Sequence, residues 1–574
     1  MFVSEFSIWV TAAQERYLAA KKLLNNDKNN RPSDPYRNKY EARDIFAQIE
    51  VELEKDWKSI DSLQVRLLSM LIKYHLGVIA HETDDRSSGC EILTNVLEEI
   101  REVAIKPEGC YLALNVLNQL GVIWNDRGEF EKALQYLTEA EDIYKKVKDT
   151  CKMRPYEFED IFTMENDENK DWIAFEKVFT YSLYYLAQVY GHLHDDKKSA
   201  MYCREVLKRQ LDSGEFETID WVFNCVTLAH HYIQQNSFLE ARHLLSCAAH
   251  VLLKYEIKVE QNIEENRDAW TEIHHSKASL SCGWLKYSIN LLACAVKPDE
   301  KTDDTETFCK LIVDEEVSKR ENRIPYIITN YNEARNIFLF AQNHTTVAKS
   351  YYILNEYANN YVQITQDHSK LFKNLIAYDP DLGRQCKMHK RRMDMLEDLL
   401  DKLNPQFYLS VCRQIQFEIG EICHEMIDLK TKIAHLVRDG ITVTRAKKIN
   451  CIATKGIHYF QKFIDSFKDR DGKLPEVFSE DTVRPVLIAH FYIGRYYSKL
   501  IESDTNKKLH NLLKTEEYYK FIVKYAEQNE QHAPFIKQEL PVVNEMLELM
   551  TEKMSRKGFP HVLILGMKEL VFFP

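Results

Sequence analysis

Two histidine–glutamate pairs are the residues of this chain that best match catalytic chemistry. His81–Glu82 and His424–Glu425 each match the start of an H-E-x-x-H helix, in which two histidines bind Zn²⁺ and the glutamate is a general base. No second histidine completes either motif, so a zinc ligand is missing in both. Asp469–Gly472 (DRDG) resembles part of a calcium loop, but Phe467 and Phe478 occupy its first and last ligand positions. None of these matches predicts a metal site.

The remaining candidate metal ligands are short pairs with no second pair at ligand spacing, and surface histidines are the better interpretation. These pairs are His192 with His194, His274 with His275, and Cys386 with His389. The chain also contains no P-loop, no G-x-S-x-G nucleophile turn and no G-x-G-x-x-G dinucleotide motif. We therefore expect a protein that is not an enzyme and that needs no cofactor or metal.

A run of basic residues, 384–392 (RQCKMHKRR), has three interpretations. The first is a solvated helix face whose cations pair with Glu397 and Asp398, because opposite charges close in helical sequence commonly attract each other. The second is a patch that binds a partner, and the third is a nuclear localisation signal. We favour the first.

Composition indicates a soluble helical protein. The chain has 574 residues, more than a single hydrophobic core accommodates, so several domains or a repeat array is expected. Only 16 Gly and 14 Pro favour long helices, and a net charge of −12 argues against general nucleic-acid binding. The 13 cysteines lack framework spacing, which is typical of reduced cytosolic thiols. With no signal peptide and no apolar run of about 18 residues, we expect a cytoplasmic protein without a membrane span.

Four helix pairs share one spacing of small residues, typical of tetratricopeptide repeats. Each copy has a small residue after a leucine in its first helix, a second small residue twelve positions later, and a further apolar or cysteine residue sixteen positions later. The first positions are Gly77, Gly121, Ala187 and Ala229; the second are Gly89, Ala133, Ser199 and Ala241; the third are Leu93, Leu137, Cys203 and Leu245. A general helical bundle is the alternative, but the constant twelve-residue offset favours a solenoid.

The repeat array is irregular and is interrupted once. The first small residues are separated by 44, 66 and 42 positions, and the long interval contains a polar insertion at 148–172. The best copy also carries Gly128 at its turn, where a left-handed residue is needed. Ile419–Gly420 and Ile493–Gly494 repeat the apolar–glycine signal further along the chain.

Composition shifts divide the chain into four parts. We predict an N-terminal tetratricopeptide-like solenoid at 1–297, a charged linker or linker helix at 298–325, and a C-terminal helical solenoid at 326–554. The last part, 555–574, is an atypical tail because its SRKGFPHVLILGMKELVFFP sequence is apolar. Within the first part, amphipathic helices are expected near 1–24 and 39–55.

Four stretches carry a resemblance to known proteins: SKLFKNLIAYDPDLGRQCKMHKRRMDMLEDLLDKLNPQFYLSVCRQIQFEI at 369–418, FEKVFTYSLYYLAQVYGHL at 175–193, LKRQL at 207–211 and FLEARHLLSCA at 238–248. They resemble the kinesin-binding protein family, also called the KIF-binding protein family. The resemblance implies a cytosolic right-handed α-solenoid in two halves joined by a linker helix. It implies a monomer that grips the motor domains of a subset of kinesins and blocks their binding to microtubules, with roles in axonal microtubule organisation and neuronal outgrowth.

The resemblance places motor contacts on the inner helices of the N-terminal half, at Tyr185, Gln188, Gln210, Thr227 and Lys277. The repeat spacing supports two of them, because Tyr185 and Thr227 each stand two residues before the small residue of their helix. Inter-helix packing is an equally good interpretation of Tyr185, since aromatic residues serve both roles. We expect the groove to be acidic and to accept an amphipathic helix from the basic track-binding surface of the motor.

A general tetratricopeptide adaptor for helical or peptide segments remains the alternative function. Repeat proteins that clamp chaperone C-termini carry Lys and Asn at inner positions. The position after the small residue here reads Val78, Val122, Gln188 and His230, which argues against that clamp.

Overall fold

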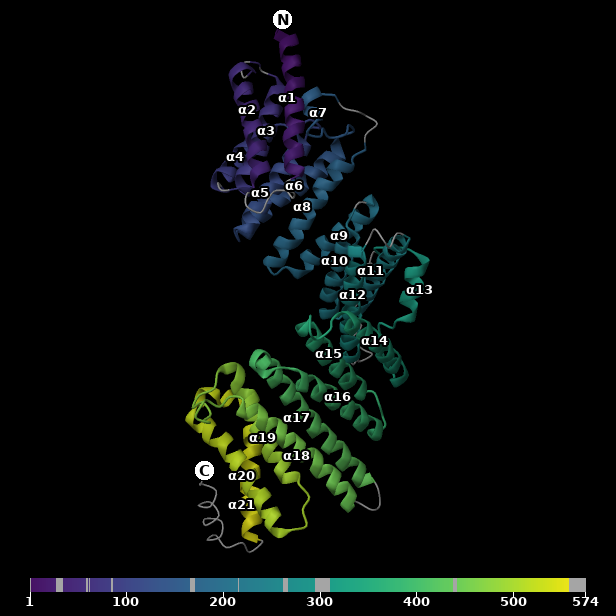
Figure 1. The fold of residues 1–574 in the computed structure, drawn as a ribbon, viewed down its shortest axis with the longest axis vertical. Coiled ribbons are helices and arrows are strands. Elements are labelled where there is room, and N and C mark those ends of the chain that lie inside the picture. The colour runs from purple at the N-terminus through teal and green to yellow at the C-terminus, as the bar shows by residue number, and fades with distance from the viewer. Residues whose placement is uncertain are drawn as a thin grey trace. The chain divides into compact units, whose positions relative to one another are not determined.

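The computed structural model describes residues 2–26, 35–57, 60, 62–83, 86–165, 171–214, 216–261, 267–294, 310–436 and 441–556. These residues form helices and connecting segments and contain no β-strand (Figure 1). Consecutive long helices pack as antiparallel pairs, α3 with α4 and α5 with α6, for example. The predicted all-α solenoid of helix pairs is therefore confirmed.

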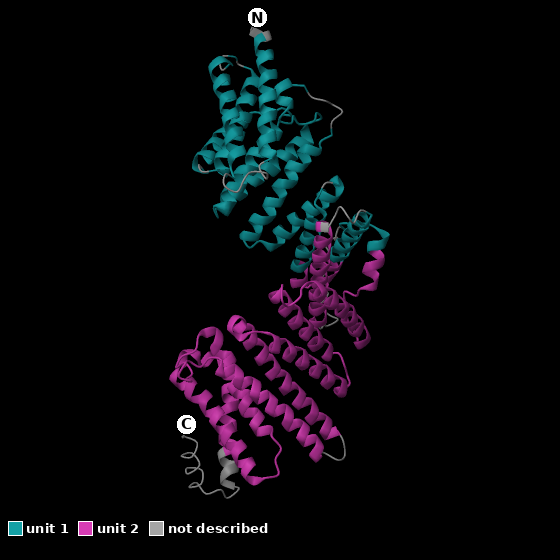
Figure 2. Cartoon of the chain, in the orientation of Figure 1, with its two compact units in different colours: residues 1–231, 243–261, 307–317 teal, residues 232–242, 262–306, 318–574 magenta. Residues whose placement is uncertain are grey.

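The chain divides into two compact units (Figure 2). Unit 1 comprises 1–231, 243–261 and 307–317, and unit 2 comprises 232–242, 262–306 and 318–574. The helices of unit 1 are α1 (Phe2–Asn25), α2 (Arg37–Glu52), α3 (Leu63–Glu82), α4 (Arg86–Ile100), α5 (Cys110–Asp126), α6 (Phe130–Thr150), α7 (Asp160–Thr163), α8 (Ile173–His192) and α9 (Asp196–Ser213), with a short π-helical turn at Leu53–Trp57.

Three helices have residues in both units: α10 (Thr218–Gln234), α11 (Phe238–Glu260) and α13 (Glu315–Arg323). The other helices of unit 2 are α12 (Arg267–Ala293), α14 (Tyr331–Tyr351), α15 (Ala358–Ile376), α16 (Leu382–Lys402), α17 (Pro405–Leu436), α18 (Val443–Asp465), α19 (Glu480–Lys499), α20 (Thr505–Gln528) and α21 (Glu539–Arg556), with a 3₁₀ turn at Glu530–Ile536. Two segments of our domain prediction, 298–309 in the linker and 557–574 in the tail, lie outside the described residues.

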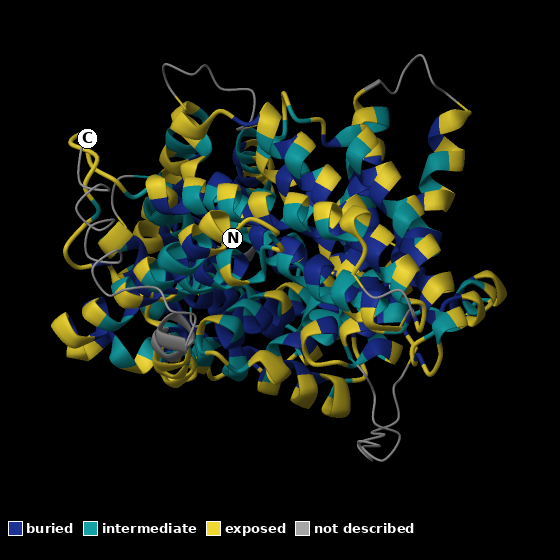
Figure 3. Ribbon diagram, turned by 90° about the horizontal axis from the view of Figure 1, so that it is seen from below, coloured by how far each residue is buried: buried dark blue, intermediate teal, exposed yellow. Residues whose placement is uncertain are grey.

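The small residues of the repeat lie where paired helices cross. A Cβ atom on Gly77 would lie 2.9 Å from Leu93, and one on Gly121 would lie 2.7 Å from Leu137, which are the pairs that the sixteen-residue spacing links. In the third pair the hydroxyl of Ser199 donates a hydrogen bond to the carbonyl of Ala187, at 2.8 Å. The spacing thus records close contact between the two helices in these three pairs. Figure 3 shows buried and exposed positions following one another along many of the described helices.

In unit 2, glycines also lie where paired helices cross, but the side chains packed against them are aromatic. Cβ atoms on Gly420 and Gly494 would each lie 2.5 Å from a ring, that of Phe460 in the first case and of Tyr519 in the second.

At the turn between α5 and α6, Gly128 has a φ of +76°, so the predicted left-handed glycine is confirmed.

Replacing Gly121 with Leu should destabilise the protein by about 1–3 kcal/mol, because the added side chain has to displace the buried Leu137. Chemical denaturation followed by circular dichroism measures the effect. Gly191→Ala is the control, since the nearest atom to its Cβ would be the Ser199 hydroxyl at 3.5 Å. An unchanged midpoint for Gly121→Leu would mean that this crossing is loosely packed.

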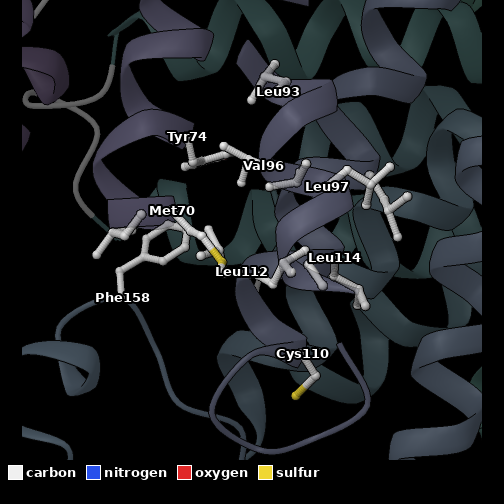
Figure 4. Close-up of a cluster of buried hydrophobic side chains, with 14 of the residues drawn as sticks. Met70, Tyr74, Leu93, Val96, Leu97, Cys110, Leu112, Leu114 and Phe158 are labelled. Carbon is white, nitrogen blue, oxygen red and sulfur yellow. The ribbon is translucent and has the colours of Figure 1, made fainter. Parts of the chain in front are cut away.

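The predicted polar insertion at 148–172 differs from expectation, because much of its described part is buried. Phe158 packs edge-on against Tyr111, with ring centroids 5.0 Å apart, and Figure 4 shows it beside Met70 and Tyr74. The side chain of Arg154 is 4% exposed and pairs with Asp160 at 2.7 Å. The segment therefore belongs to the core of unit 1. Its few apolar residues are separated by charged ones, so the composition of the segment does not indicate that it is buried.

A candidate partner-binding groove

A groove of about 1190 Å³ lies on unit 1, between residues of α6, α8, α9 and α10. Residues on consecutive turns of α8 and α9 form most of its lining, so the helix pair whose crossing is fixed by Ala187 and Ser199 also shapes the groove. The lining residues are Tyr144, Trp172, Ile173, Glu176, Lys177, Thr180, Tyr181, Tyr184, Tyr185, Glu205, Val206, Lys208, Arg209, Gln210, Asp212, Ser213, Asp220, Phe223 and Asn224.

Three tyrosines of α8 form an aromatic cluster in this groove. Tyr181 and Tyr184 are 48% and 40% exposed, whereas Tyr185 is half-buried and packs against the core of unit 1. The hydroxyls of Tyr181 and Tyr185 lie 3.1 Å apart, and the rings of Tyr184 and Tyr185 meet edge to face with centroids 5.3 Å apart. Burial and the hydrogen bond with Tyr181 raise the pKa of Tyr185. The groove therefore offers a partner an uncharged aromatic surface, in which Tyr185 holds the exposed Tyr181 and Tyr184 through a hydrogen bond and a ring contact.

An ion-pair network fixes the wall of the groove next to the tyrosines. Arg209 pairs with Glu176 and with Glu205, both at 2.9 Å, and its guanidinium lies 4.7 Å from the centroid of the Phe179 ring. The hydroxyl of Tyr144 donates a 2.6 Å hydrogen bond to Glu176. Burial acts to raise the pKa of Glu176, but hydrogen bonds from Lys148 and Tyr144 outweigh it and hold that pKa below its usual value. Glu176 is thus ionised and already paired within the protein.

Gln210 lines the groove and carries a buried polar atom. Its Oε1 atom is inaccessible to solvent and has no hydrogen-bond partner in the structure. An unmet buried acceptor typically costs about 1–3 kcal/mol. Because this atom is closed to solvent, a ligand could pair with it only after the side chain turns, and Gln210 is a candidate contact through its place in the lining.

The charge of the groove differs from the expected acidic character. Its lining has four carboxylates, Glu176, Glu205, Asp212 and Asp220, and three cations, Lys177, Lys208 and Arg209. The groove is therefore nearly neutral. The prediction of an acidic groove came from the basic track-binding surface expected of the partner, and not from residues of this surface.

The five predicted contact residues have different positions. Tyr185 and Gln210 lie in the lining of the same groove, while Gln188 and Thr227 are outside that lining. Thr227 is exposed and donates its hydroxyl to the carbonyl of Phe223 at 2.9 Å. Lys277 is half-buried on α12, in unit 2. The sequence reading missed Tyr181 and Tyr184, although the T-Y-S-L-Y-Y spacing already placed them with Tyr185 on one side of a helix.

The histidines considered as metal ligands have other neighbours. His192 stacks on Phe130 with ring centroids 4.5 Å apart, and His424 lies 3.3 Å from Asp428. Burial, only partly offset by Asp428, lowers the pKa of His424 to about 4, so the ring is neutral. In the described parts of the chain, no group of three or more His, Cys, Asp or Glu residues could hold a metal ion.

The basic run on α16 is mostly the solvated face that we favoured, because Arg384, Lys387, Lys390 and Arg391 are exposed, but its expected pairing and one of its residues differ. Glu397 and Asp398 pair with Lys455 and Lys402, at 2.6 Å and 2.7 Å, rather than with the run. One member of the run, Arg392, is 1% exposed. The pairing prediction was wrong because Lys455, on another helix, pairs with Glu397, and because Lys402, one turn after Asp398, pairs with Asp398.

Arg392 is the centre of a buried polar network between α16 and α17. Its guanidinium contacts Glu418 at 3.3 Å and Glu425 at 3.1 Å, and its Nε donates to the Ser369 hydroxyl at 3.2 Å. Burial acts to raise the pKa of Glu425, but the hydrogen bond with His389 and the charges of His389 and Arg392 prevail and lower it to about 2. The network links three helices of unit 2.

Helix α3 is the one described helix with the length and composition to cross a membrane. A core helix passes the same test, and 56% of the relevant window of α3 is buried inside the protein. Leu67, Leu71 and Ile72 of this helix belong to the core of unit 1.

Comparison with known proteins identifies the family. Residues 219–556 match the family model described as KIF-1 binding protein C terminal. The KIF-binding proteins of Gallus gallus and Homo sapiens are each 33% identical to this chain; the alignments cover 95% and 94% of the chain, and 97% of either relative. A solved structure described as a cryo-EM map of KIFBP has a TM-score of 0.64 at 28% identity, covering 95% of this chain and 99% of that one. The chain therefore belongs to the KIF-binding protein family.

Proposed function

We propose that this chain binds the motor domains of a subset of kinesins in the groove of unit 1 and thereby blocks their association with microtubules. Its relatives are named KIF-binding proteins and align with nearly its whole length. The observation that carries the proposal is the groove itself, which brings the exposed Tyr181 and Tyr184 together with the half-buried Tyr185 and Gln210. The expected setting is the cytoplasm, where the protein would regulate microtubule-based transport and axon outgrowth.

The groove chemistry suits an amphipathic helix of the motor. Tyr181 and Tyr184 offer large rigid surfaces that lose little conformational entropy on binding, which is why tyrosine is frequent among interface anchors. Exposed Lys208, Asp212 and Asp220 offer charges of both signs at the margin. A helix with apolar residues on one face and mixed charges beside them would match this lining.

Inhibition should compete with the microtubule and not with nucleotide. The groove is proposed to cover the track-binding surface of the motor and to leave its nucleotide site open. A motor held in the complex should therefore still exchange its nucleotide. Microtubule co-sedimentation measures release from the track, and a fluorescent nucleotide analogue measures exchange on the same motor. A complexed motor that kept its full affinity for microtubules would contradict the mechanism.

A general adaptor for helical or peptide segments is the second candidate, because a neutral aromatic groove does not by itself select a motor. Co-sedimentation with a panel of kinesin motor domains separates the two. Release of a defined subset supports motor inhibition. Binding of isolated peptides with no release of any motor would favour the adaptor.

A further inference from the structure

The three tyrosines of α8 form an aromatic surface with a defined geometry. The ring planes of Tyr181 and Tyr184 differ by 25°, and their centroids lie 6.4 Å apart. The ring of Tyr185 stands nearly perpendicular to both, at 71° to the first and 85° to the second. We call these three residues the tyrosine cluster. Because Tyr185 packs against the core of unit 1, it holds the two exposed rings in nearly the same orientation.

The ring faces of the tyrosine cluster carry no cation, unlike two other aromatic rings of the same groove. The guanidinium of Arg209 lies 5.3 Å from the centroid of the Tyr144 ring, and the amine of Lys148 lies 4.6 Å from that of Trp172. Among the described residues, no arginine or lysine lies over a ring of the cluster, including Lys177 of the same helix. The cluster therefore leaves aromatic faces free for a partner.

The electrostatics of the tyrosine cluster favour a positive group. The face of an aromatic ring carries the negative part of its quadrupole and attracts cations. A carboxylate adds to this field. Burial and the hydrogen bond with Tyr181 are the main causes of the raised pKa of Tyr185, and the neighbouring tyrosines and Asp126, the last residue of α5, contribute further. A negative charge thus acts on the cluster from a second helix.

We infer, on the basis of the function proposed above, that the tyrosine cluster binds an arginine side chain of the kinesin motor. A guanidinium is planar and weakly hydrated, so it stacks on aromatic faces more readily than an ammonium group does. Two nearly parallel rings hold such a flat group in one orientation. Its N–H groups can donate to Tyr181 and Tyr185, because the 3.1 Å hydrogen bond between their hydroxyls leaves each oxygen an acceptor position.

An arginine contact of this kind would make the groove selective among motors. A motor with an arginine at the matching position of its track-binding surface would be bound. A motor with a neutral residue there would meet the same rings without the attraction and would be left on the microtubule. The tyrosine cluster would then determine which kinesins form the bound subset.

Three paired variants of the full-length protein separate the ring faces from apolar area. Tyr181→Phe/Tyr184→Phe keeps the faces, Tyr181→Leu/Tyr184→Leu keeps large apolar side chains without them, and Tyr181→Ala/Tyr184→Ala removes both. Microtubule co-sedimentation is measured with a motor that the parent protein releases. The Phe pair should act within about threefold of the parent concentration, and the Leu pair should need at least about tenfold more. All three should keep the parent melting temperature, because both side chains are 40% or more exposed.

The outcomes separate failure of the arginine contact from failure of the groove as the motor site. If the Leu pair releases the motor like the parent while the Ala pair does not, the tyrosines are apolar anchors, and only the arginine contact is refuted. If the Phe pair weakens release as much as the Leu pair, the hydroxyls are recognised instead of the ring faces, and the arginine contact is again refuted. If the Ala pair also releases the motor like the parent, the motor does not bind here and both proposals fail.

Arginine-to-glutamine variants of the same motor test the other side of the contact. The Kd of each motor variant is measured without microtubules, once with the parent protein and once with the Leu pair. One arginine of the track-binding surface should weaken binding about tenfold with the parent and less than about threefold with the Leu pair, because a contact that is already absent cannot be lost again. Equal effects of every arginine on both proteins would overturn the inference.

Discussion

Replacing Arg392 with Leu should lower the free energy of unfolding by about 3 kcal/mol. Removing one partner of a buried ion pair typically costs about 3–5 kcal/mol, because the other charge stays in a poorly solvated site. We expect the lower end of that range, since the side chains of Glu418 and Glu425 are 22% and 35% exposed and can be partly hydrated. Chemical denaturation of the full chain measures the change.

Two further variants show whether the cause is the ion pair. Lys390→Leu removes a cation of the same basic run, but Lys390 is exposed and pairs with Asp394 on the surface, so stability should change by less than about 0.5 kcal/mol. Adding Glu418→Gln and Glu425→Gln to Arg392→Leu should recover part of the loss by removing the stranded charges. Equal effects of Arg392→Leu and Lys390→Leu would show that Arg392 acts only as a surface cation.

The repeat could be predicted from sequence because its signal is local. Gly77 and Leu93 lie sixteen residues apart and touch across one helix pair, so the close approach leaves a pattern at a fixed spacing. The same holds for Gly121 with Leu137. A helix crossing allows only small residues at such points, and four copies make the pattern visible without knowledge of the overall arrangement.

The network around Arg392 could not be predicted in the same way. Its partners Glu418 and Glu425 stand 26 and 33 positions further along the chain, and neither charge shows by its type that it is buried. Glu397 was expected to pair with the basic run of its own helix, but it pairs with Lys455 of α18, which is far away in the sequence. Sequence patterns describe contacts within a helix pair, whereas these contacts depend on how successive pairs stack.

The groove was partly predictable. The resemblance indicated Tyr185 and Gln210, which both line it. The repeat spacing supported Tyr185 but also Thr227, which lies outside the lining. A groove depends on which side chains remain exposed after the pairs have stacked. That information is absent from the spacing of small residues, which reports only where helices touch.

Changing Tyr181 and Tyr184 together to Ala should weaken motor binding by at least about 2 kcal/mol, which is about thirtyfold in Kd. Both side chains are 40% or more exposed, so truncation leaves no large cavity, and the melting temperature should stay close to that of the parent. The measurement is the concentration of this protein that releases half of a kinesin from microtubules.

Controls at other sites decide whether the groove is responsible. Phe407→Ala removes an aromatic side chain that is 79% exposed in unit 2 and should leave release unchanged. Gln188→Glu/Thr227→Glu changes two predicted contacts outside the groove lining, and should therefore weaken release less than loss of the tyrosines. If the Tyr181/Tyr184 variant folds normally and still removes kinesin at the original concentration, the motor does not bind in this groove. If Gln188→Glu/Thr227→Glu weakens release more than loss of the tyrosines, the motor instead contacts α8 and α10 around Gln188 and Thr227, outside the groove lining.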